Sequence, residues 1–310
     1  MERIDGGTRI ERLRGGIVAL GNFDGFHSGH QAVVGRAVAL ARDRGVPAIV
    51  ATFDPHPVRY FKPDVPPFRL TSLDQRAALF AAAGADAMLV FRFDAALAAV
   101  TAEAFVTDWL VARAGASGVV TGEDYTFGKG RGGSIAVLHA LGAANGLSVE
   151  TVAPVAAPIG SGGGIVSSSR IRAALQAGDC ATACALMTRP FAVRGVVQHG
   201  DKVGRTIGYP TANLDMGDYL RPRYGIYACR GRLSDGRLLN GAANLGVRPT
   251  FAPPKELLEP YFFDFAGDLY GATIEVELHA FIRPEAKFDN LGALQAQMAK
   301  DCDVARDLLR

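Results

Sequence analysis

The stretch GNFDGFHSGH, residues 21–30, places two histidines three residues apart among glycines. It directly follows an apolar run that is predicted to be the strand Ile17–Leu20, and a helical pattern begins at Gly29. Backbone N–H groups and the helix dipole at such a strand–turn–helix junction attract anions. His27 and His30 can donate to a phosphate oxygen while charge builds on it in a transition state. The stretch therefore predicts a phosphate-binding site; the alternative is an ordinary turn with surface histidines.

Other residues of the same turn also suit phosphate or metal binding. Glycine lets the backbone approach a ligand closely, and Asn22 and Asp24 carry oxygen atoms that can position a phosphate or a metal ion. The predicted phosphate-binding residues of the turn are Gly21, Asn22, Phe23, Asp24 and Gly29.

The first half of the chain alternates strand and helix patterns around this turn. Such alternation predicts an α/β domain with a parallel sheet covered by helices on both faces. The expected strands are 17–20, 48–53, 88–91, 118–121 and 149–152, and the expected helices are 29–44, 72–84, 101–114 and 134–145.

The second half shows a different pattern. Short apolar runs separated by Gly, Pro, Asn and Asp turns predict a small antiparallel barrel. The expected strands are 191–198, 225–233, 237–247, 261–265 and 273–282, followed by a closing helix over 291–309. A loop over 153–164 and helical residues up to about Met187 lie between the halves, so we predict two domains, 1–187 and 188–310.

Bulk composition agrees with two globular domains and excludes some classes of function. The chain has 310 residues, 49% of them hydrophobic, and a net charge of +2. A near-neutral charge argues against nucleic acid or membrane surfaces as partners. No apolar run approaches a bilayer span, and the N-terminus lacks the apolar core of a signal peptide. We therefore expect a cytoplasmic protein that acts on small molecules; its oligomeric state is not predicted.

Two motifs resemble signatures of the nucleotidyltransferase superfamily. His27-Ser28-Gly29-His30 resembles its HxGH signature, and Ser167-Ser168-Ser169-Arg170-Ile171-Arg172 resembles its serine-rich signature at a helix start. The resemblance implies that Ser168, Ser169 and Arg172 bind the phosphates of ATP, with Arg170 as the alternative to Arg172. We expect a capped helix start at Ser168 or Ser169 and expect both motifs at the carboxyl edge of the parallel sheet.

Further segments resemble the prokaryotic riboflavin kinase/FAD synthetase family over essentially the whole chain. They are TFDPHP at 52–57, GEDYTFGKGRGG at 122–133, GRTIGYPTAN at 204–213, GIYA at 225–228 and NLGVRPT at 244–250. The resemblance implies an N-terminal nucleotidyltransferase module of Rossmann-like fold and a C-terminal barrel kinase. It also implies two reactions, phosphorylation of riboflavin to FMN by ATP and adenylylation of FMN to FAD with release of pyrophosphate, both with Mg²⁺.

The family resemblance assigns a flavin-binding loop to the first module. It contains Asp124, Tyr125 and Phe127, and aromatic rings there can stack on the isoalloxazine ring. The alternative for Tyr125 and Phe127 is that they anchor the loop in the core. The phosphate of FMN would attack the α-phosphorus of ATP directly, without a covalent enzyme intermediate.

In the second module the resemblance assigns metal and phosphate binding to the segment 204–213. The Thr211 hydroxyl and the Asn213 carbonyl are hard oxygen ligands that suit Mg²⁺ shared with ATP. The turn residues Gly204, Arg205, Thr206 and Gly208 leave backbone N–H groups for the phosphates. The alternative is a plain turn.

The kinase reaction needs a group that accepts the proton of the riboflavin hydroxyl. The family places a glutamate at the start of a barrel strand, and Glu259 matches. Pro260 removes a backbone donor directly after it, which predicts an edge strand or a strand's first residue. Glu256 and Asp264 compete with Glu259, and a surface carboxylate is the alternative.

Four further residues are assigned to the flavin by the resemblance: Asn244, Arg248, Arg283 and Phe288. Arg283 is alternatively a surface residue at a strand end. Thr188 stands where the family more often has glycine, and we expect this to affect only the linker.

Two other readings of the whole chain compete with a bifunctional enzyme. One is an adenylyltransferase whose barrel only binds flavin. The other is a flavin-binding regulator with decayed sites, or a barrel that binds nucleic acid. The presence of each nucleotide-handling motif argues against decay, and the absence of a basic stripe argues against nucleic acid.

Overall fold

The computed structural model describes residues 1–6, 11–199, 208–248 and 255–310. By compactness the chain divides into two units. Unit 1 comprises 1–65, 73–156 and 164–166, and unit 2 comprises 66–72, 157–163 and 167–310. The two compact units are not the same as the two predicted domains, because residues 167–187 belong to the barrel unit. The domain boundary after residue 187 therefore stays a prediction.

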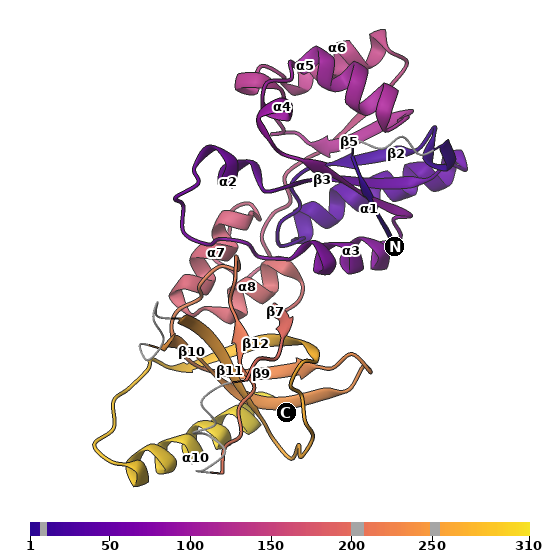
Figure 1. Cartoon of the computed structure of the whole chain (residues 1–310). Coiled ribbons are helices and arrows are strands. Elements are labelled where there is room, and N and C mark those ends of the chain that lie inside the picture. Colours follow the sequence, from indigo (N-terminus) through magenta and orange to yellow (C-terminus); the bar gives the residue numbers. More distant parts are fainter. Residues whose placement is uncertain (7–10, 200–207, 249–254) are drawn as a thin grey trace. The chain divides into compact units, whose positions relative to one another are not determined.

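Unit 1 contains a six-stranded sheet in which all the neighbouring strands are parallel, as predicted (Figure 1). The strand order is β1-β4-β3-β2-β5-β6, so the chain reverses its direction of travel across the sheet between β2 and β5. In such sheets ligands bind at the carboxyl ends of the strands beside this switch point. The strands are β1 (Glu2–Asp5), β2 (Ile17–Leu20), β3 (Ala48–Asp54), β4 (Ala87–Arg92), β5 (Gly118–Gly122) and β6 (Ser148–Val152).

Helices cover both faces of this sheet because successive strand residues point to opposite sides and both sides are apolar. One apolar cluster joins Ile17 and Ala19 to the first and third helices, and a second joins Val18 and Leu20 to the later helices. The helices are α1 (Ser28–Arg44), α2 (Pro57–Phe61), α3 (Leu73–Ala82), α4 (Ala95–Ala98), α5 (Ala102–Ala104), which continues as a π-helix (Phe105–Arg113), and α6 (Ile135–Ala144).

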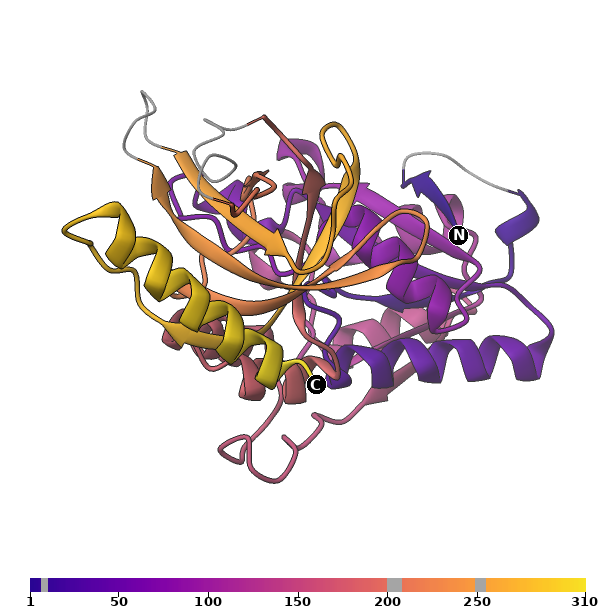
Figure 2. The ribbon, with the colours of Figure 1, turned by 90° about the horizontal axis from the view of Figure 1, so that it is seen from below.

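Unit 2 is built on a nearly closed antiparallel barrel, as predicted (Figure 2). The strand order is β7-β12-β9-β10-β11-β8. The strands are β7 (Phe191–Val196), β8 (Leu214–Asp215), β9 (Gly225–Arg232), β10 (Leu238–Arg248), β11 (Lys255–Phe262) and β12 (Thr273–Arg283). The terminal helix α10 (Leu291–Leu308) packs along β9, β10 and β12.

One strand differs from its prediction. The strand expected at 261–265 is β11, which begins before that range and ends at Phe262. Pro260 therefore lies inside a strand, and it is neither the first residue nor at a free edge. Its carbonyl accepts the N–H of Ala212 at 3.0 Å, and Ala243 lies opposite it on β10. Proline has no N–H to donate, so the pairing with Ala212 rests on this one hydrogen bond to the Pro260 carbonyl.

Unit 2 also contains segments from outside the barrel sequence. Residues 66–72 lie between α2 and α3 in the chain, yet Arg69 pairs with the barrel segment 218–220. The N–H of Arg69 donates to the Asp218 carbonyl at 3.1 Å, and the N–H of Leu220 donates to the Arg69 carbonyl at 2.8 Å. Two helices, α7 (Ser168–Ala177) and α8 (Cys180–Met187), complete the unit.

No helix in the described part of the chain is long and apolar enough to cross a membrane.

Candidate active sites

The turn after β2 is held in an unusual backbone conformation. β2 is fully buried, and the turn that follows has positive φ angles at Phe23 (50°), Gly25 (84°) and Phe26 (37°). Non-glycine residues adopt this region rarely, and such conformations concentrate at functional sites. Both phenylalanine rings pack edge-on against Phe80 of α3, with centroids 5.8 and 5.1 Å away. The core thus fixes the turn at the switch point of the sheet.

The two histidines of the turn lie against each other. Their ring centroids are 3.6 Å apart and the rings are stacked. His27 is the N-cap of α1, and its Nδ1 accepts the backbone N–H of His30 at 3.3 Å. A nitrogen that accepts carries no proton, so the neutral His27 ring has its proton on Nε2. Gly29 belongs to this arrangement because a Cβ there would lie 3.2 Å from the His27 ring.

The sequence reasoning missed an arginine that supports this turn. Arg76 of α3 is 3% exposed and donates to the carbonyl of Asn22 at 3.0 Å and to the Thr52 hydroxyl at 2.9 Å. The Thr52 hydroxyl in turn donates to the same carbonyl at 2.9 Å. The sequence offered one sign of this role: Arg76 is a charged residue in the largely apolar helix sequence LDQRAALFAA.

The serine-rich segment begins a helix as expected, with one refinement. Ser167 is the N-cap of α7, and its hydroxyl accepts the N–H of Arg170 at 3.3 Å. Both arginines already contact backbone carbonyls of unit 2. Arg172 Nε donates to Phe68 at 2.8 Å, and Arg170 Nη2 donates to Ser161 at 2.7 Å. These contacts orient both guanidinium groups, which are suited to binding phosphate through several N–H donors.

The predicted flavin loop after β5 packs against the core through both of its aromatic rings. Phe127 is 6% exposed and belongs to the apolar cluster of unit 1. Tyr125 is half-buried and lies parallel to Phe127, with centroids 6.0 Å apart, and Asp124 is exposed. Both rings therefore fit the anchoring alternative, since Tyr125 packs against the same cluster as Phe127. Flavin contact by Tyr125 and Asp124 stays a prediction.

A second aromatic group in unit 1 was not predicted. Tyr60 and Phe61 of α2 meet Phe93 edge-on, with centroids 5.4 and 5.7 Å away. Phe61 is 65% exposed and Tyr60 is 36% exposed. Large exposed apolar side chains in a group are typical of a binding surface.

In unit 2 the predicted base and a predicted metal ligand are close in the barrel register. Glu259 of β11 lies opposite Asn244 of β10. On the other side, Leu258 pairs with Leu214, so the same register carried on by one residue places Asn213 opposite Glu259. Glu259 is 8% exposed and Asn213 is 7% exposed. Directly opposite residues of antiparallel strands share a face, so these three side chains form one polar row.

The two competitors of Glu259 have other surroundings. Glu256 Oε2 accepts from Arg221 Nε at 2.7 Å, and its other oxygen accepts from the Tyr224 hydroxyl. Partial burial favours the neutral acid, but these two donors outweigh it and lower the pKa of Glu256 below its usual value. Asp264 is exposed and has a positive φ of 55° beyond the end of β11. Glu259 is thus the buried carboxylate of the three.

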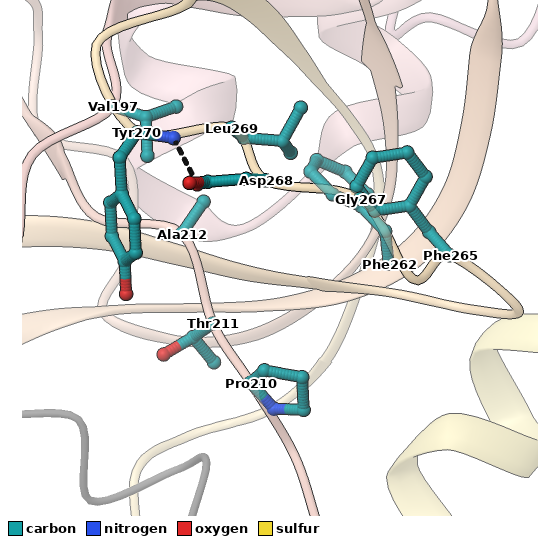
Figure 3. A pocket seen from close by; sticks show the side chains of 10 residues that line it. All are labelled: Val197, Pro210, Thr211, Ala212, Phe262, Phe265, Gly267, Asp268, Leu269 and Tyr270. Atoms are coloured by element: carbon teal, nitrogen blue, oxygen red, sulfur yellow. Dashed lines mark hydrogen bonds between the residues drawn. The ribbon is translucent and has the colours of Figure 1, made fainter.

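A pocket adjoins the predicted metal ligands (Figure 3). Thr211 lies at its wall, and the N–H of Tyr270 donates to Asp268 Oδ1 at 2.9 Å on the opposite side. The pocket is lined by Val197, Pro210, Thr211, Ala212, Phe262, Phe265, Gly267, Asp268, Leu269 and Tyr270. Pro210, Thr211 and Ala212 belong to the motif at 204–213. The other lining residues were not predicted, because turn residues such as Gly267 and Asp268 carry no spacing signal.

Arg283 has a protein partner that accounts for its charge. Its guanidinium forms a bidentate ion pair with Asp301 of α10. Nε donates to Oδ1 at 2.9 Å, and Nη2 donates to Oδ2 at 2.6 Å. Asp301 is buried and also accepts from Gln297 at 2.9 Å. The same guanidinium lies 5.7 Å from the centroid of the Phe288 ring. This ion pair joins β12 to α10, and flavin binding by Arg283 and Phe288 stays a prediction.

Several predicted residues are described only in part. Gly208 is exposed with a φ of 85°, which glycine adopts readily. The backbone of Arg248 pairs with Lys255 at the end of β10. Gly204, Arg205 and Thr206 lie outside the described residues.

Comparisons with known proteins assign both halves of the chain. The FAD synthetase family matches residues 9–170, and the riboflavin kinase family matches residues 187–309. The α/β unit with its histidine turn and the barrel with its polar row thus correspond to the two modules of a transferase.

The relatives extend over almost the whole chain. The bifunctional riboflavin kinase/FMN adenylyltransferase of Escherichia coli K12 is 38% identical over 293 residues, covering 94% of this chain and 92% of the relative. That of Bacillus subtilis 168 is 36% identical, covering 92% and 90%. The chain belongs to this bifunctional family. A Streptococcus pneumoniae crystal structure described as a macrolide-efflux protein is 31% identical, with a TM-score of 0.87 and 99% of both chains covered.

Proposed function

We propose that this chain catalyses both reactions of its family. Riboflavin and ATP give FMN and ADP, and FMN and a second ATP give FAD and pyrophosphate. The observation that carries this conclusion is the match of two successive families, residues 9–170 to FAD synthetase and residues 187–309 to riboflavin kinase. We assign the adenylyltransferase to residues 1–187 and the kinase to 188–310.

In adenylyl transfer the FMN phosphate attacks the α-phosphorus of ATP, and the bond to pyrophosphate breaks. The histidine pair supports this role because the Nδ1 of His27 is used by the helix, which leaves its Nε2–H as the donor. His30 stacks on His27 at the helix N-terminus, where the dipole also favours phosphate. We assign phosphate contacts in unit 1 to Gly21, Asn22, Asp24 and Gly29. The contacts of Ser168, Ser169 and Arg172 with ATP stay an expectation from the family resemblance.

The flavin of this reaction needs an aromatic surface. Tyr60 and Phe61 offer exposed ring faces, and Tyr125 is half-buried in the predicted flavin loop. Offset stacking between aromatic rings contributes about 0.5–1.5 kcal/mol beyond the area buried. We therefore propose that these rings bind the isoalloxazine, while the buried Phe127 holds the loop.

In the kinase reaction Glu259 accepts the proton of the riboflavin 5′-hydroxyl as that oxygen attacks the γ-phosphorus. Its position supports this role, because Glu259 is buried in the polar row opposite Asn244. Glu256 is a weaker base, since Arg221 and Tyr224 lower its pKa. Asp264 is exposed outside the row.

Mg²⁺ and ATP fit the region between the polar row and the pocket. The Thr211 hydroxyl and the Asn213 amide oxygen are hard donors of the kind that Mg²⁺ binds together with phosphates. A bound Mg²⁺ would neutralise charge on those phosphates. The pocket beside Thr211 has the aromatic and apolar lining of a small-molecule site, so we propose that it holds the nucleotide.

The test supplies each reaction with its own substrate. Purified protein with riboflavin, ATP and Mg²⁺ is analysed for FMN and ADP, and protein with FMN, ATP and Mg²⁺ is analysed for FAD and pyrophosphate. Both products are expected. An adenylyltransferase whose barrel only binds flavin would leave riboflavin unchanged, and replacing both Thr211 and Asn213 by alanine would then change nothing.

A further inference from the structure

Arg76 is a buried cation that contacts the ends of two neighbouring strands in unit 1. One contact is the carbonyl of Asn22, in the turn directly after β2. The others are Thr52 and Asp54 at the end of β3, where Nη1 donates to the Thr52 hydroxyl and Nη2 lies 4.0 Å from Asp54 Oδ1. Arg76 thus joins α3 to the carboxyl edge of the parallel sheet, where ligands of such folds bind.

Stability alone does not account for a guanidinium at this position. Moving a guanidinium out of water carries a desolvation cost, and well-packed apolar side chains are often as stabilising as a buried ion pair. Ala77 and Phe80 of the same helix already pack in an apolar cluster of unit 1. The hydrogen bonds that Arg76 donates therefore point to a role in arranging the turn.

These hydrogen bonds fix the direction of one peptide group. The Asn22 carbonyl accepts from Arg76 Nη1 at 3.0 Å and from Thr52 Oγ1 at 2.9 Å, and a carbonyl oxygen has two lone pairs. The peptide that follows Asn22 is trans, so its carbonyl and its N–H point in opposite directions. With the carbonyl directed toward α3 and β3, the N–H of Phe23 points away from them.

The backbone at Phe23 is strained, and this strain needs support. Its φ of 50° lies in a region that non-glycine residues rarely adopt. Such conformations persist where the surrounding contacts hold them. The two hydrogen bonds to the preceding carbonyl provide such contacts, together with the packing of the Phe23 ring on Phe80.

We propose that Arg76 is a positioning residue of the adenylyltransferase, which holds the peptide between Asn22 and Phe23 so that the Phe23 N–H donates to a phosphate of ATP. This inference rests on the proposed adenylyl transfer. A carbonyl oxygen would repel a phosphate, and Arg76 keeps this one turned into the core. A cation bound to the carbonyl also polarises the peptide and strengthens its N–H as a donor. Arg76 acts through the backbone and does not itself touch the nucleotide.

A merely structural role for Arg76 makes a different prediction. An arginine that only holds α3 against the sheet would affect each ligand of the site alike when it is removed. An arginine that presents a phosphate donor would matter for ligands that carry phosphates and not for ligands that lack them. Comparing a nucleoside with a nucleoside triphosphate therefore separates the two roles.

The experiment uses the full chain and measures FAD formation from FMN, since this product reports the adenylyltransferase alone. Adenosine and α,β-methylene ATP, which resists cleavage at the reacting bond, serve as inhibitors competing with ATP. The variants are Arg76→Lys, which keeps the cation, Arg76→Gln, which keeps a neutral donor, and Arg76→Met, which keeps only the length. The control is Arg92→Met, at the exposed end of β4.

We expect Arg76→Met to raise the inhibition constant of α,β-methylene ATP about tenfold or more and to leave that of adenosine unchanged. Arg76→Gln should lie between Arg76→Met and the wild type, and Arg76→Lys should lie close to the wild type. The kcat/KM for ATP should fall in the same order. Phosphorylation of riboflavin and thermal unfolding report whether each variant chain is intact, and Arg92→Met should match the wild type throughout.

Two results would overturn the inference while leaving the adenylyltransferase in place. One is an Arg76→Met enzyme in which both inhibition constants rise by the same factor, which would make the role structural. The other is an Arg76→Met enzyme that matches the wild type. If Arg76→Met does not fold, Arg76→Gln takes its place in both comparisons. A wild type that forms no FAD from FMN would instead refute the proposed adenylyl transfer, and the inference would fall with it.

Discussion

A histidine that caps its own helix has its tautomer fixed by the backbone. His27 accepts the N–H of His30 through Nδ1, so the hydrogen bond that begins α1 also places the proton of the neutral ring on Nε2. The residue thus combines a structural and a chemical function. A substitution test must separate them.

The variant His27→Asn separates them because asparagine is also a good N-cap. We expect it to fold with nearly unchanged stability and to lose FMN adenylylation by about 10²–10³-fold, the usual effect of removing one transition-state donor. Phosphorylation of riboflavin should persist. The measurement is the initial rate of each reaction with its own substrate, and His139→Asn on the exposed face of α6 is the control. Normal FAD formation in His27→Asn would refute the role of the imidazole.

The three carboxylates near β11 allow a matched comparison. Glu259→Gln removes the proposed base with little change of shape, and we expect riboflavin phosphorylation to fall about 10²–10⁴-fold. FMN adenylylation should be unchanged. Glu256→Gln and Asp264→Asn are the controls and should retain most kinase activity. If Glu256→Gln is the variant that loses activity, the assignment of the base is wrong.

The lowered pKa of Glu256 predicts how stability depends on pH. A carboxylate with a depressed folded pKa contributes stability above its unfolded pKa of about 4.3, and this contribution is lost as the pH falls through the lower folded value. The side chain is 31% exposed, so the contribution is about 1 kcal/mol or less. Urea unfolding of wild type and Glu256→Gln should differ at pH 7 and converge below pH 4. If the difference in unfolding free energy between wild type and Glu256→Gln stayed constant over this pH range, ionised Glu256 would not be the source of the stability.

At the scale of elements, helix α8 ends on a residue that its conformation disfavours. Thr188 is the C-cap with a φ of 61° and a ψ of 17°, a left-handed conformation that suits glycine and is strained for a β-branched residue. The glycine that the family resemblance implies at this position would adopt the left-handed conformation without strain.

Thr188→Gly should stabilise the protein by about 1 kcal/mol, because the strain of the left-handed conformation is removed. Thermal or urea unfolding measures the change. Thr182→Gly, inside the same helix, is the control and should destabilise it. A loss of stability in Thr188→Gly would show that the threonine contacts, including its hydroxyl bond to Met187 at 2.6 Å, outweigh the strain.

The sequence predicted these elements well where a periodic apolar pattern was long. The alternation in the first half and the turn spacing in the second predicted the parallel sheet and the barrel. β1 was not predicted because only Ile4 of its four residues is buried. The start of β11 was missed because Pro260 carries a strong local signal against a strand interior, and tertiary pairing with Ala212 overrides that signal.

The sites were predictable to a different extent. His27, Asn213 and Glu259 came from motifs, and a motif reflects chemistry directly. Arg76 and the lining of the pocket were missed, because their roles depend on contacts between residues far apart in the chain. Only the folded structure shows that Arg76 of α3 holds the carbonyl of Asn22.

At the scale of the whole molecule, chain order and compact units do not coincide. The segment 66–72 lies within the sequence of the first module but pairs with the barrel unit, and α7 carries the serine-rich motif within that same unit. The chain therefore passes between the two units more than once.

The most direct test of a bifunctional enzyme is a time course with one starting flavin. The purified chain is incubated with riboflavin, excess ATP and Mg²⁺, and the flavins are separated by chromatography. FMN should appear first and FAD afterwards, and chelation of the metal should stop both steps. FMN that accumulates without FAD would contradict the account of the histidine turn. Conversion of added FMN to FAD while riboflavin stays untouched would reduce the barrel to a binding module and refute the role of Glu259.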